Sequence, residues 1–159
     1  WVPPARSPKR FRMGEKRYFA DPSIAMSSLG MDPEALLHDW QTFGLAFENL
    51  CMRDLLVYAR TLPKIGREPI RYYHDDSGLE VDVIIELTDG RWAALEIKSS
   101  QAKVSEATEH LNRLRAKLTK NKKARIREPE FMAVIVGISE MTYQTSDGIY
   151  VVPITDLTA

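Results

Sequence analysis

Residues 78–100 place four charged side chains inside two apolar, strand-like segments, and this pattern restricts how the chain can fold. The segment reads GLEVDVIIELTDGRWAALEIKSS. Side chains of a strand alternate between the two faces of a sheet, so one face would be apolar and the other would carry the charges. Burial of an unpaired carboxylate is strongly unfavourable. The sequence therefore predicts a compensating partner for the charged residues Glu80, Asp82, Glu96 and Lys98.

The turn between the two segments determines which residues lie opposite one another. A two-residue loop would place Asp82 and Glu96 on opposite faces. A three-residue loop over 88–90 ends at Gly90, where the left-handed conformation favours glycine, and it places Asp82 opposite Glu96. We therefore predict the three-residue loop. In that register one face is formed by Val81, Val83, Ile85, Leu87, Ala93, Leu95 and Ile97.

The acidic pair of Asp82 and Glu96 suggests a metal site. Carboxylates directly opposite one another, with Cβ atoms about 5 Å apart, are destabilising unless a proton or a cation lies between them. Oxygen ligands without a cluster of Cys or His favour Mg²⁺ or Mn²⁺. Lys98 would then stabilise an oxyanion or orient an attacking water. The alternative is an ordinary cross-strand ion pair of Glu80 with Lys98 at a solvated sheet edge.

The remaining hydrophobic pattern predicts an α/β fold with a mixed sheet flanked by helices. Asp32 followed by Pro33 is typical of a helix start. A strand, a helix and a further apolar strand in succession favour a parallel, right-handed connection. The predicted helices cover residues 32–40, 42–61 and 103–118, and the predicted strands cover 70–74, both arms of the hairpin, 131–136 and 149–152.

Glu48 is a further candidate ligand because it lies on a mostly apolar helical surface. Its neighbours one turn away include Leu45 and Met52. Such an acid either reaches solvent along the surface or has a function. Gly44 lies one turn earlier and costs a helix up to about 1 kcal/mol, which suggests that another group approaches closely.

A basic run lies between Arg113 and Arg127, with eight basic residues and no acidic residue. Such a run can neutralise phosphates and would be a local footprint for nucleic acid. The simpler interpretation, which we favour, is the solvated face of a helix and its exit loop. The candidate nucleic-acid-binding residues are Arg113, Lys117, Lys120, Lys122, Lys123 and Arg125.

Composition limits the other possibilities. The chain has 159 residues, of which 44% are hydrophobic, enough for one domain over residues 18–159. Basic and acidic residues number 22 each, so no overall charge favours nucleic acid or membrane. The single Cys51, the lack of an apolar run long enough for a bilayer and the lack of a secretory segment favour the cytoplasm. We interpret residues 1–17, which are Pro-rich and basic, as a linker from an upstream part of a longer protein.

Two family resemblances follow from these residues. The segments YFADPSIA, FGLAFENL, GLEVDVIIEL, ALEIKSS and DGIYVVPI resemble the C-terminal domain of unknown function 4143, which follows an AAA-type ATPase module in many bacterial and archaeal proteins. Glu48 on a helix, Asp82 on a strand and Glu96-Ile97-Lys98 on the next strand resemble the PD-(D/E)XK nuclease superfamily. The second resemblance implies an αβββαβ core like that of restriction endonucleases.

The resemblance to the nuclease superfamily also implies roles for individual residues. Glu48, Asp82, Glu96 and the backbone carbonyl of Ile97 would bind Mg²⁺ or Mn²⁺, and Lys98 would position water and offset charge. The reaction would be metal-assisted hydrolysis of a phosphodiester, as in a deoxyribonuclease. Members often carry Gln on the following helix, for which Gln101 is the candidate in this sequence.

The resemblances imply partners but leave the activity open. Nucleic acid and an upstream ATPase module in the same polypeptide are the expected partners. ATP would bind only that module, because the chain has no GxxxxGK phosphate loop. The alternative is a catalytically inactive interaction or regulatory domain with the same fold. Such a domain would serve the ATPase by docking or by oligomerising.

Overall fold

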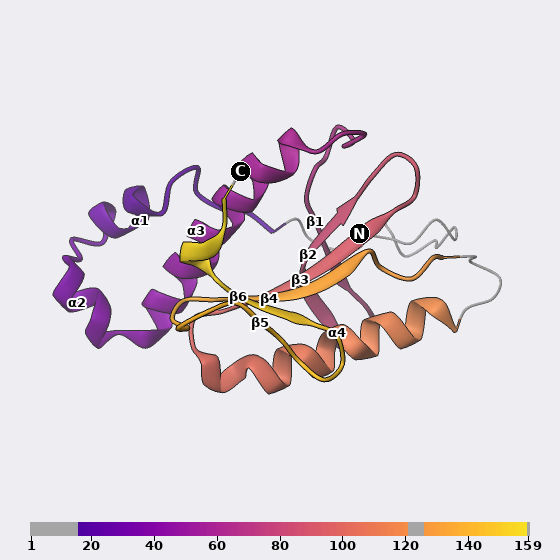
Figure 1. Cartoon of the computed structure of the whole chain (residues 1–159). Helices are drawn as coiled ribbons and strands as arrows, with labels where there is room; N and C mark the ends of the chain where they lie inside the picture. Colours follow the sequence, from indigo (N-terminus) through magenta and orange to yellow (C-terminus); the bar gives the residue numbers. More distant parts are fainter. Residues whose placement is uncertain (1–15, 121–125, 159) are drawn as a thin grey trace.

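The protein folds as a mixed sheet between helices, as predicted (Figure 1). The computed structural model describes residues 16–120 and 126–158. The six-stranded sheet has the order β1-β2-β3-β4-β6-β5. Its strands are β1 (Arg71–His74), β2 (Glu80–Glu86), β3 (Trp92–Lys98), β4 (Phe131–Val136), β5 (Tyr143–Gln144) and β6 (Tyr150–Pro153).

The helices pack against opposite faces of the sheet. They are α1 (Pro22–Ser28), α2 (Pro33–His38), α3 (Trp40–Thr61) and α4 (Val104–Thr119), with short 3₁₀ turns at Gln101–Lys103 and Ile154–Asp156. Helix α3 covers one face, α4 covers the other, and α1 and α2 pack against α3 (Figure 1). Strands β3 and β4 are parallel and α4 connects them, which confirms the predicted crossover.

Three aspartates begin the three N-terminal helices. Asp32 accepts a hydrogen bond from Ala35 N and Pro33 follows it, as predicted for α2. Asp39 caps α3, so the second predicted helix begins slightly earlier than residue 42. Asp21 caps α1, a helix that the hydrophobic pattern does not predict because none of its residues is buried.

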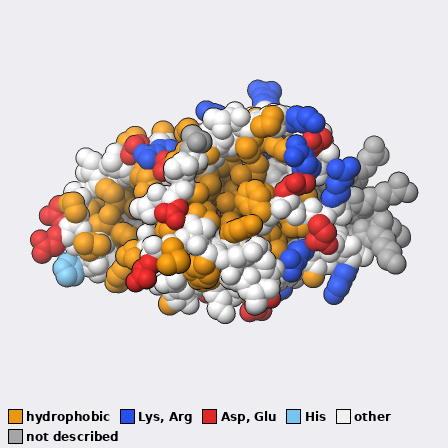
Figure 2. All heavy atoms as spheres, in the orientation of Figure 1, with side chains coloured by type: hydrophobic (Ala, Val, Ile, Leu, Met, Phe, Trp, Pro, Cys, Tyr) orange, Lys and Arg blue, Asp and Glu red, His pale blue; other side chains and the backbone are white. Residues whose placement is uncertain are grey.

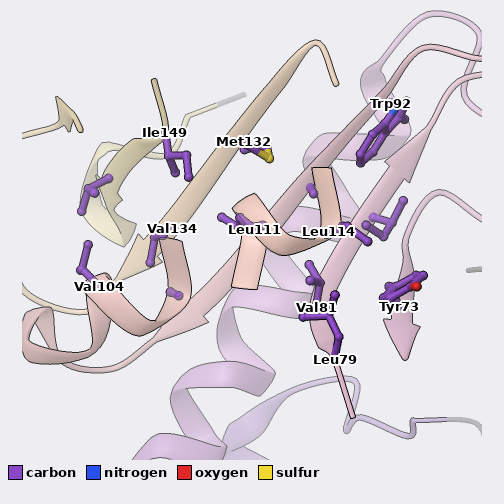
Figure 3. Packing of buried hydrophobic residues seen from close by; sticks show 14 of the residues in the cluster. Tyr73, Leu79, Val81, Trp92, Val104, Leu111, Leu114, Met132, Val134 and Ile149 are labelled. Atoms are coloured by element: carbon purple, nitrogen blue, oxygen red, sulfur yellow. The ribbon is translucent and has the colours of Figure 1, made fainter. Parts of the chain in front are cut away.

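Two hydrophobic cores lie on either side of the sheet. The core beneath α4 is shown in Figure 3, where Leu111 and Leu114 of the helix point toward Val134 and Val81 of the strands. The core beneath α3 is formed by Phe47, Cys51, Leu55, Ala59, Val83, Ile85, Leu95, Ile97, Ala133 and Ile135. Cys51 is fully buried, as predicted for a packed helix residue.

The β2–β3 hairpin has the predicted register near its turn. Val83 pairs with Leu95, and Glu86 pairs with Trp92. The backbone N–H of Leu87 donates to the carbonyl of Arg91, which leaves residues 88–90 as the loop. Gly90 has a φ of +83°, the left-handed conformation that this loop requires.

The alternation of β2 breaks at Asp82, and here the sequence prediction is wrong. Opposite a step of two residues on β1, β2 advances three residues from Val81 to Ile84, which is a β-bulge. Val81 therefore packs in the core beneath α4, whereas Val83 packs beneath α3. The predicted single apolar face does not include Val81, because a bulge reverses the order of inward and outward side chains.

Candidate functional site

Asp82 lies in the bulge of β2, and its carboxylate contacts both β3 and Lys16. Its Oδ2 accepts a hydrogen bond from the backbone N–H of Ile97 at 2.9 Å. Its Oδ1 lies 3.6 Å from Lys16 Nζ. The two oxygens of the Asp82 carboxylate therefore contact different partners, the backbone of β3 and the ammonium of Lys16.

Glu96 is the buried acid of the site, with only 1% of its surface exposed. It shares a face of β3 with Ala94, beneath α4. The pKa of Glu96 is raised to about 8: burial is the largest cause, the charge of Asp82 and a side-chain hydrogen bond with it act in the same direction, and Lys98 offsets part of the rise. The sequence prediction that Asp82 and Glu96 lie together is consistent with this contact.

Two cationic or polar side chains face Glu96. Lys98 Nζ lies 2.9 Å from Glu96 Oε2. His110 Nδ1, from α4, lies 3.4 Å from Glu96 Oε1. That Oε1 is buried and makes no hydrogen bond in the described part of the protein. The sequence analysis does not single out His110, because it lies on α4 and no local pattern relates that helix position to Glu96 of β3.

Lys98 and Glu80 do not pair as the alternative interpretation requires. Lys98 pairs with Glu96, two residues earlier on the same strand. Glu80 pairs with Lys16 and lies 3.5 Å from His74 Nδ1. The predicted cross-strand pair of Glu80 with Lys98 is therefore wrong, since the bulge at Asp82 shifts Glu80 toward β1.

Glu48 joins the site from α3. Its Oε1 accepts a hydrogen bond from the hydroxyl of Tyr18 at 2.7 Å and lies 3.9 Å from Lys16 Nζ. Burial and the Glu48 carboxylate raise the pKa of Tyr18, so the hydroxyl keeps its proton and remains a donor. Lys16 thus connects Glu48 with the acids of β2.

Gly44 does not mark the close approach that the sequence suggested. A Cβ at this position would lie 4.0 Å from Ser99 Oγ, which is an ordinary contact. The close approach is at Gly137, directly after β4, where a Cβ would lie 2.9 Å from the carbonyl oxygen of Ser99. Ser99 follows Lys98, so this glycine lets the chain pass close to the end of β3.

The acids match a hard divalent cation in type but do not surround one. Within residues 16–120 and 126–158, no group of three or more His, Cys, Asp and Glu side chains is arranged to hold a metal ion. Carboxylate oxygens are the ligands that Mg²⁺ and Mn²⁺ prefer. The buried Glu96 Oε1 accepts no hydrogen bond that a metal ion would have to displace, so this oxygen is available as a metal ligand. The donor chemistry fits, and metal binding would require side chains to move.

The other predicted site residues are spread along α4 and its flanks. Arg113, Lys117 and Lys120 are exposed at i, i+4 and i+7, which places them along one side of the helix. Lys117 Nζ binds Asp75 Oδ2 at 2.6 Å, so it already has a partner. Gln101 is exposed in the turn before α4. The candidates Lys122, Lys123 and Arg125 lie outside the described residues.

Comparisons with known proteins place the chain in a family. The profile described as Domain of unknown function (DUF4143) matches residues 43–157. No curated protein sequence matches the chain. A solved structure described as the refined half-complex from a tetradecameric assembly of Thermococcus gammatolerans McrB AAA+ hexamers with bound McrC is similar to 68% of this chain and 26% of that chain. The identity is 15% and the TM-score is 0.42.

Within residues 16–120 and 126–158, no helix combines the length and hydropathy that crossing a membrane demands. The family profile covers most of the chain, from the start of α3 to the last 3₁₀ turn. The chain therefore belongs to the family of the domain of unknown function 4143.

Proposed function

We propose that the acidic site binds Mg²⁺ or Mn²⁺ and serves phosphodiester hydrolysis or binding of nucleic acid. The observation that carries this proposal is the burial of Glu96 beside Asp82 and Lys98. A buried acid with a pKa near 8 destabilises the fold at neutral pH, and Glu96 Oε1 has no hydrogen bond to offset the cost. Perturbed groups of this kind cluster at functional sites.

Each side chain has a role in this proposal. Asp82, Glu96, Glu48 and the Ile97 carbonyl would hold the cation, which when bound would supply an activated water and polarise the phosphoryl group. Asp82 is fixed for this role by the Ile97 N–H. Lys98 lies beside Glu96, where its ammonium would offset the charge of a phosphate and orient water.

The nucleic acid and the ATPase are also proposals. Arg113 and Lys120 are exposed on α4 and would contact phosphates, together with the basic residues that follow the helix. Lys117 would have to exchange Asp75 for phosphate. The resemblance of the sequence segments supports an AAA-type ATPase module upstream in the same polypeptide. The single Cys51 and the composition of the sequence support a cytoplasmic setting.

Calorimetric titration of Mn²⁺ and Mg²⁺ into the 159-residue chain tests the metal site. We expect saturable binding that Asp82→Ala and Glu96→Ala both abolish. Glu109→Ala is the matched control, because Glu109 is an exposed acid on α4. The titration should be repeated with Lys16→Met, in which the cation beside Asp82 is removed. Absence of binding in both backgrounds would contradict the proposal.

A nuclease assay follows if metal binds. Branched, single-stranded and duplex DNA should be incubated with Mn²⁺ and the wild-type chain or Lys98→Met. We expect cleavage or metal-dependent binding that Lys98→Met weakens while the metal affinity stays similar. Metal binding without any effect on nucleic acid would restrict the site to a structural or regulatory role.

A non-catalytic interaction domain is the second candidate, favoured by exposed apolar side chains around α1–α3. Leu29, Leu37, Trp40 and Leu45 are each more than half exposed. Figure 2 shows hydrophobic side chains on the surface of this region. A cavity of about 440 Å³ lies beside it, between α1, α3 and the segment around Phe19. This candidate predicts no specific divalent cation site.

A further inference from the structure

We propose that Lys16 is a built-in competitor of the metal: residues 16–19 form a strap along α3, and the Lys16 ammonium takes the place of a divalent cation among the acids. The competition rests on the proposed metal site, whereas the ammonium pairing does not. The strap would hold the site in a state that binds no metal until Lys16 leaves.

Lys16 contacts carboxylates from two elements of the fold. Its Nζ forms its closest ion pair with Glu80 Oε1 and lies 3.6 Å from Asp82 Oδ1 and 3.9 Å from Glu48 Oε1. The same Nζ lies 5.5 Å from the centre of the Tyr72 ring of β1, a cation–π distance. Acids and an aromatic ring therefore surround one ammonium group.

The rest of the strap holds Lys16 in this position. The Tyr18 hydroxyl donates to Glu48, and the next residue, Phe19, pairs its backbone N–H and carbonyl with the Asn49 amide at 2.8 and 3.0 Å. Asn49 is buried, so its amide needs these partners. Further on, Asp21 pairs with Arg53. Later residues of the N-terminal segment contact later residues of α3, so this segment runs alongside the helix for several residues.

The ammonium and a metal would share the carboxylates of Glu48 and Asp82. A divalent cation such as Mg²⁺ takes ligands at about 2.0–2.1 Å, which leaves no space for an ammonium between Glu48 and Asp82. Lys16 supplies one positive charge to Glu48, Glu80 and Asp82, so net negative charge remains around it. That remaining charge favours a divalent over a monovalent cation. Binding of metal and binding of Lys16 are therefore mutually exclusive, and each weakens the other.

The first test compares Mn²⁺ affinity by calorimetry in the wild-type chain and Lys16→Met. We expect about tenfold tighter binding in Lys16→Met, within the usual range of coupling between two sites. Lys16→Arg should restore the wild-type affinity because it keeps the cation. Lys103→Met is the matched control, since Lys103 is exposed in the turn before α4. Thermal unfolding of each variant shows whether it remains folded.

The second test measures how accessible the Lys16 ammonium is, and it does not rely on metal affinity. An amine-acylating reagent is applied briefly, and the modified lysines are quantified by mass spectrometry. Lys16 should react more slowly than Lys103 without metal, and saturating Mn²⁺ should raise its reactivity severalfold. Reactivity of Lys16 equal to that of Lys103 in the absence of metal would overturn the strap.

The outcomes separate this inference from the proposed function. If the wild-type chain and Lys16→Met bind Mn²⁺ equally well, the metal site stands and the competition is overturned. If neither binds Mn²⁺ while Lys16 is protected from acylation, the metal site is overturned, and with it the competition, while the ion pairs of Lys16 remain as a structural contact.

Discussion

Glu96 holds its proton in the folded protein much more strongly than in the unfolded chain. The pKa of Glu96 is about 8 in the folded protein, whereas the ordinary pKa of a glutamate, which applies to the unfolded chain, is 4.5. Between these values the folded state binds the additional proton, so this residue favours folding below about pH 4.5 and loses that contribution as the pH rises to 8. The loss amounts to about 2 to 4 kcal/mol.

Glu96→Gln should therefore stabilise the protein under mildly basic conditions. Gln resembles the protonated acid and can still accept a hydrogen bond from Lys98. We expect the free energy of unfolding at pH 8 to rise by about 1 to 3 kcal/mol and its decrease between pH 5 and 8 to flatten. Urea unfolding at several pH values measures both. The exposed Glu109→Gln is the control, and an unchanged pH profile in Glu96→Gln would contradict the assignment.

Gly137 and Gly44 should respond to alanine in opposite directions. At Gly137 the new methyl group would meet the Ser99 carbonyl at 2.9 Å, and we expect a loss of about 1 to 3 kcal/mol. At Gly44 the nearest atom is 4.0 Å away, so the better helix propensity of alanine should add up to about 1 kcal/mol. Thermal unfolding of the two variants side by side provides the measurement. Equal effects of the two substitutions on stability would contradict the close contact between Gly137 and the Ser99 carbonyl.

At the scale of elements, the contact between α3 and the strap depends on the Asn49 amide. Asn49→Ala removes both hydrogen bonds to the backbone of Phe19. We expect a loss of about 1 to 3 kcal/mol and faster hydrogen exchange at residues 16–21, because the strap loses its buried anchor. Hydrogen exchange with mass spectrometry measures this. Asn112→Ala on α4 is the control, and exchange that rises throughout the protein would indicate general destabilisation.

Elements with strong local signals could be predicted from the sequence. The regular apolar spacing of α4 and the continuous apolar run of β4 give both elements within a residue or two. The loop ending at Gly90 gives the hairpin register. Helix α1 buries no residue and so has no hydrophobic periodicity, although Asp21 followed by Pro22 is the same start signal that predicts α2. Strand β5 has only two residues, too few for any periodicity.

The site itself could be predicted only in part. Asp82 and Glu96 lie on paired strands, and the hairpin register set by the loop at Gly90 is enough to bring these two positions near one another. The bulge at Asp82 has no sequence signature, so the position of Glu80 was wrong. Lys16 and His110 reach the site by tertiary packing, from segments distant in sequence from the acids they contact.

At the scale of the whole molecule, one sheet is shared by two cores. Leu111 of α4 is buried in the core on one face of the sheet, and Leu55 of α3 is buried in the core on the other face. We expect Leu111→Ala and Leu55→Ala each to cost about 2 to 5 kcal/mol. Unfolding should remain a single transition in both variants, because neither helix can leave without exposing the common sheet. Circular dichroism and tryptophan fluorescence should give coincident curves, and separate transitions would mean independent halves.

The order of the strands also bears on how the chain is made. Strands β1, β2 and β3 are consecutive and adjacent, so they can pair through short turns while the ribosome is still adding later residues. Strand β4 must wait for α4 to be synthesised before it can pair with β3 in parallel. Glu48, Asp82 and Glu96 all emerge before that event, whereas His110 arrives with the crossover helix. The acids can thus be assembled while solvent still reaches Glu96, and its desolvation is deferred until the nascent sheet is covered.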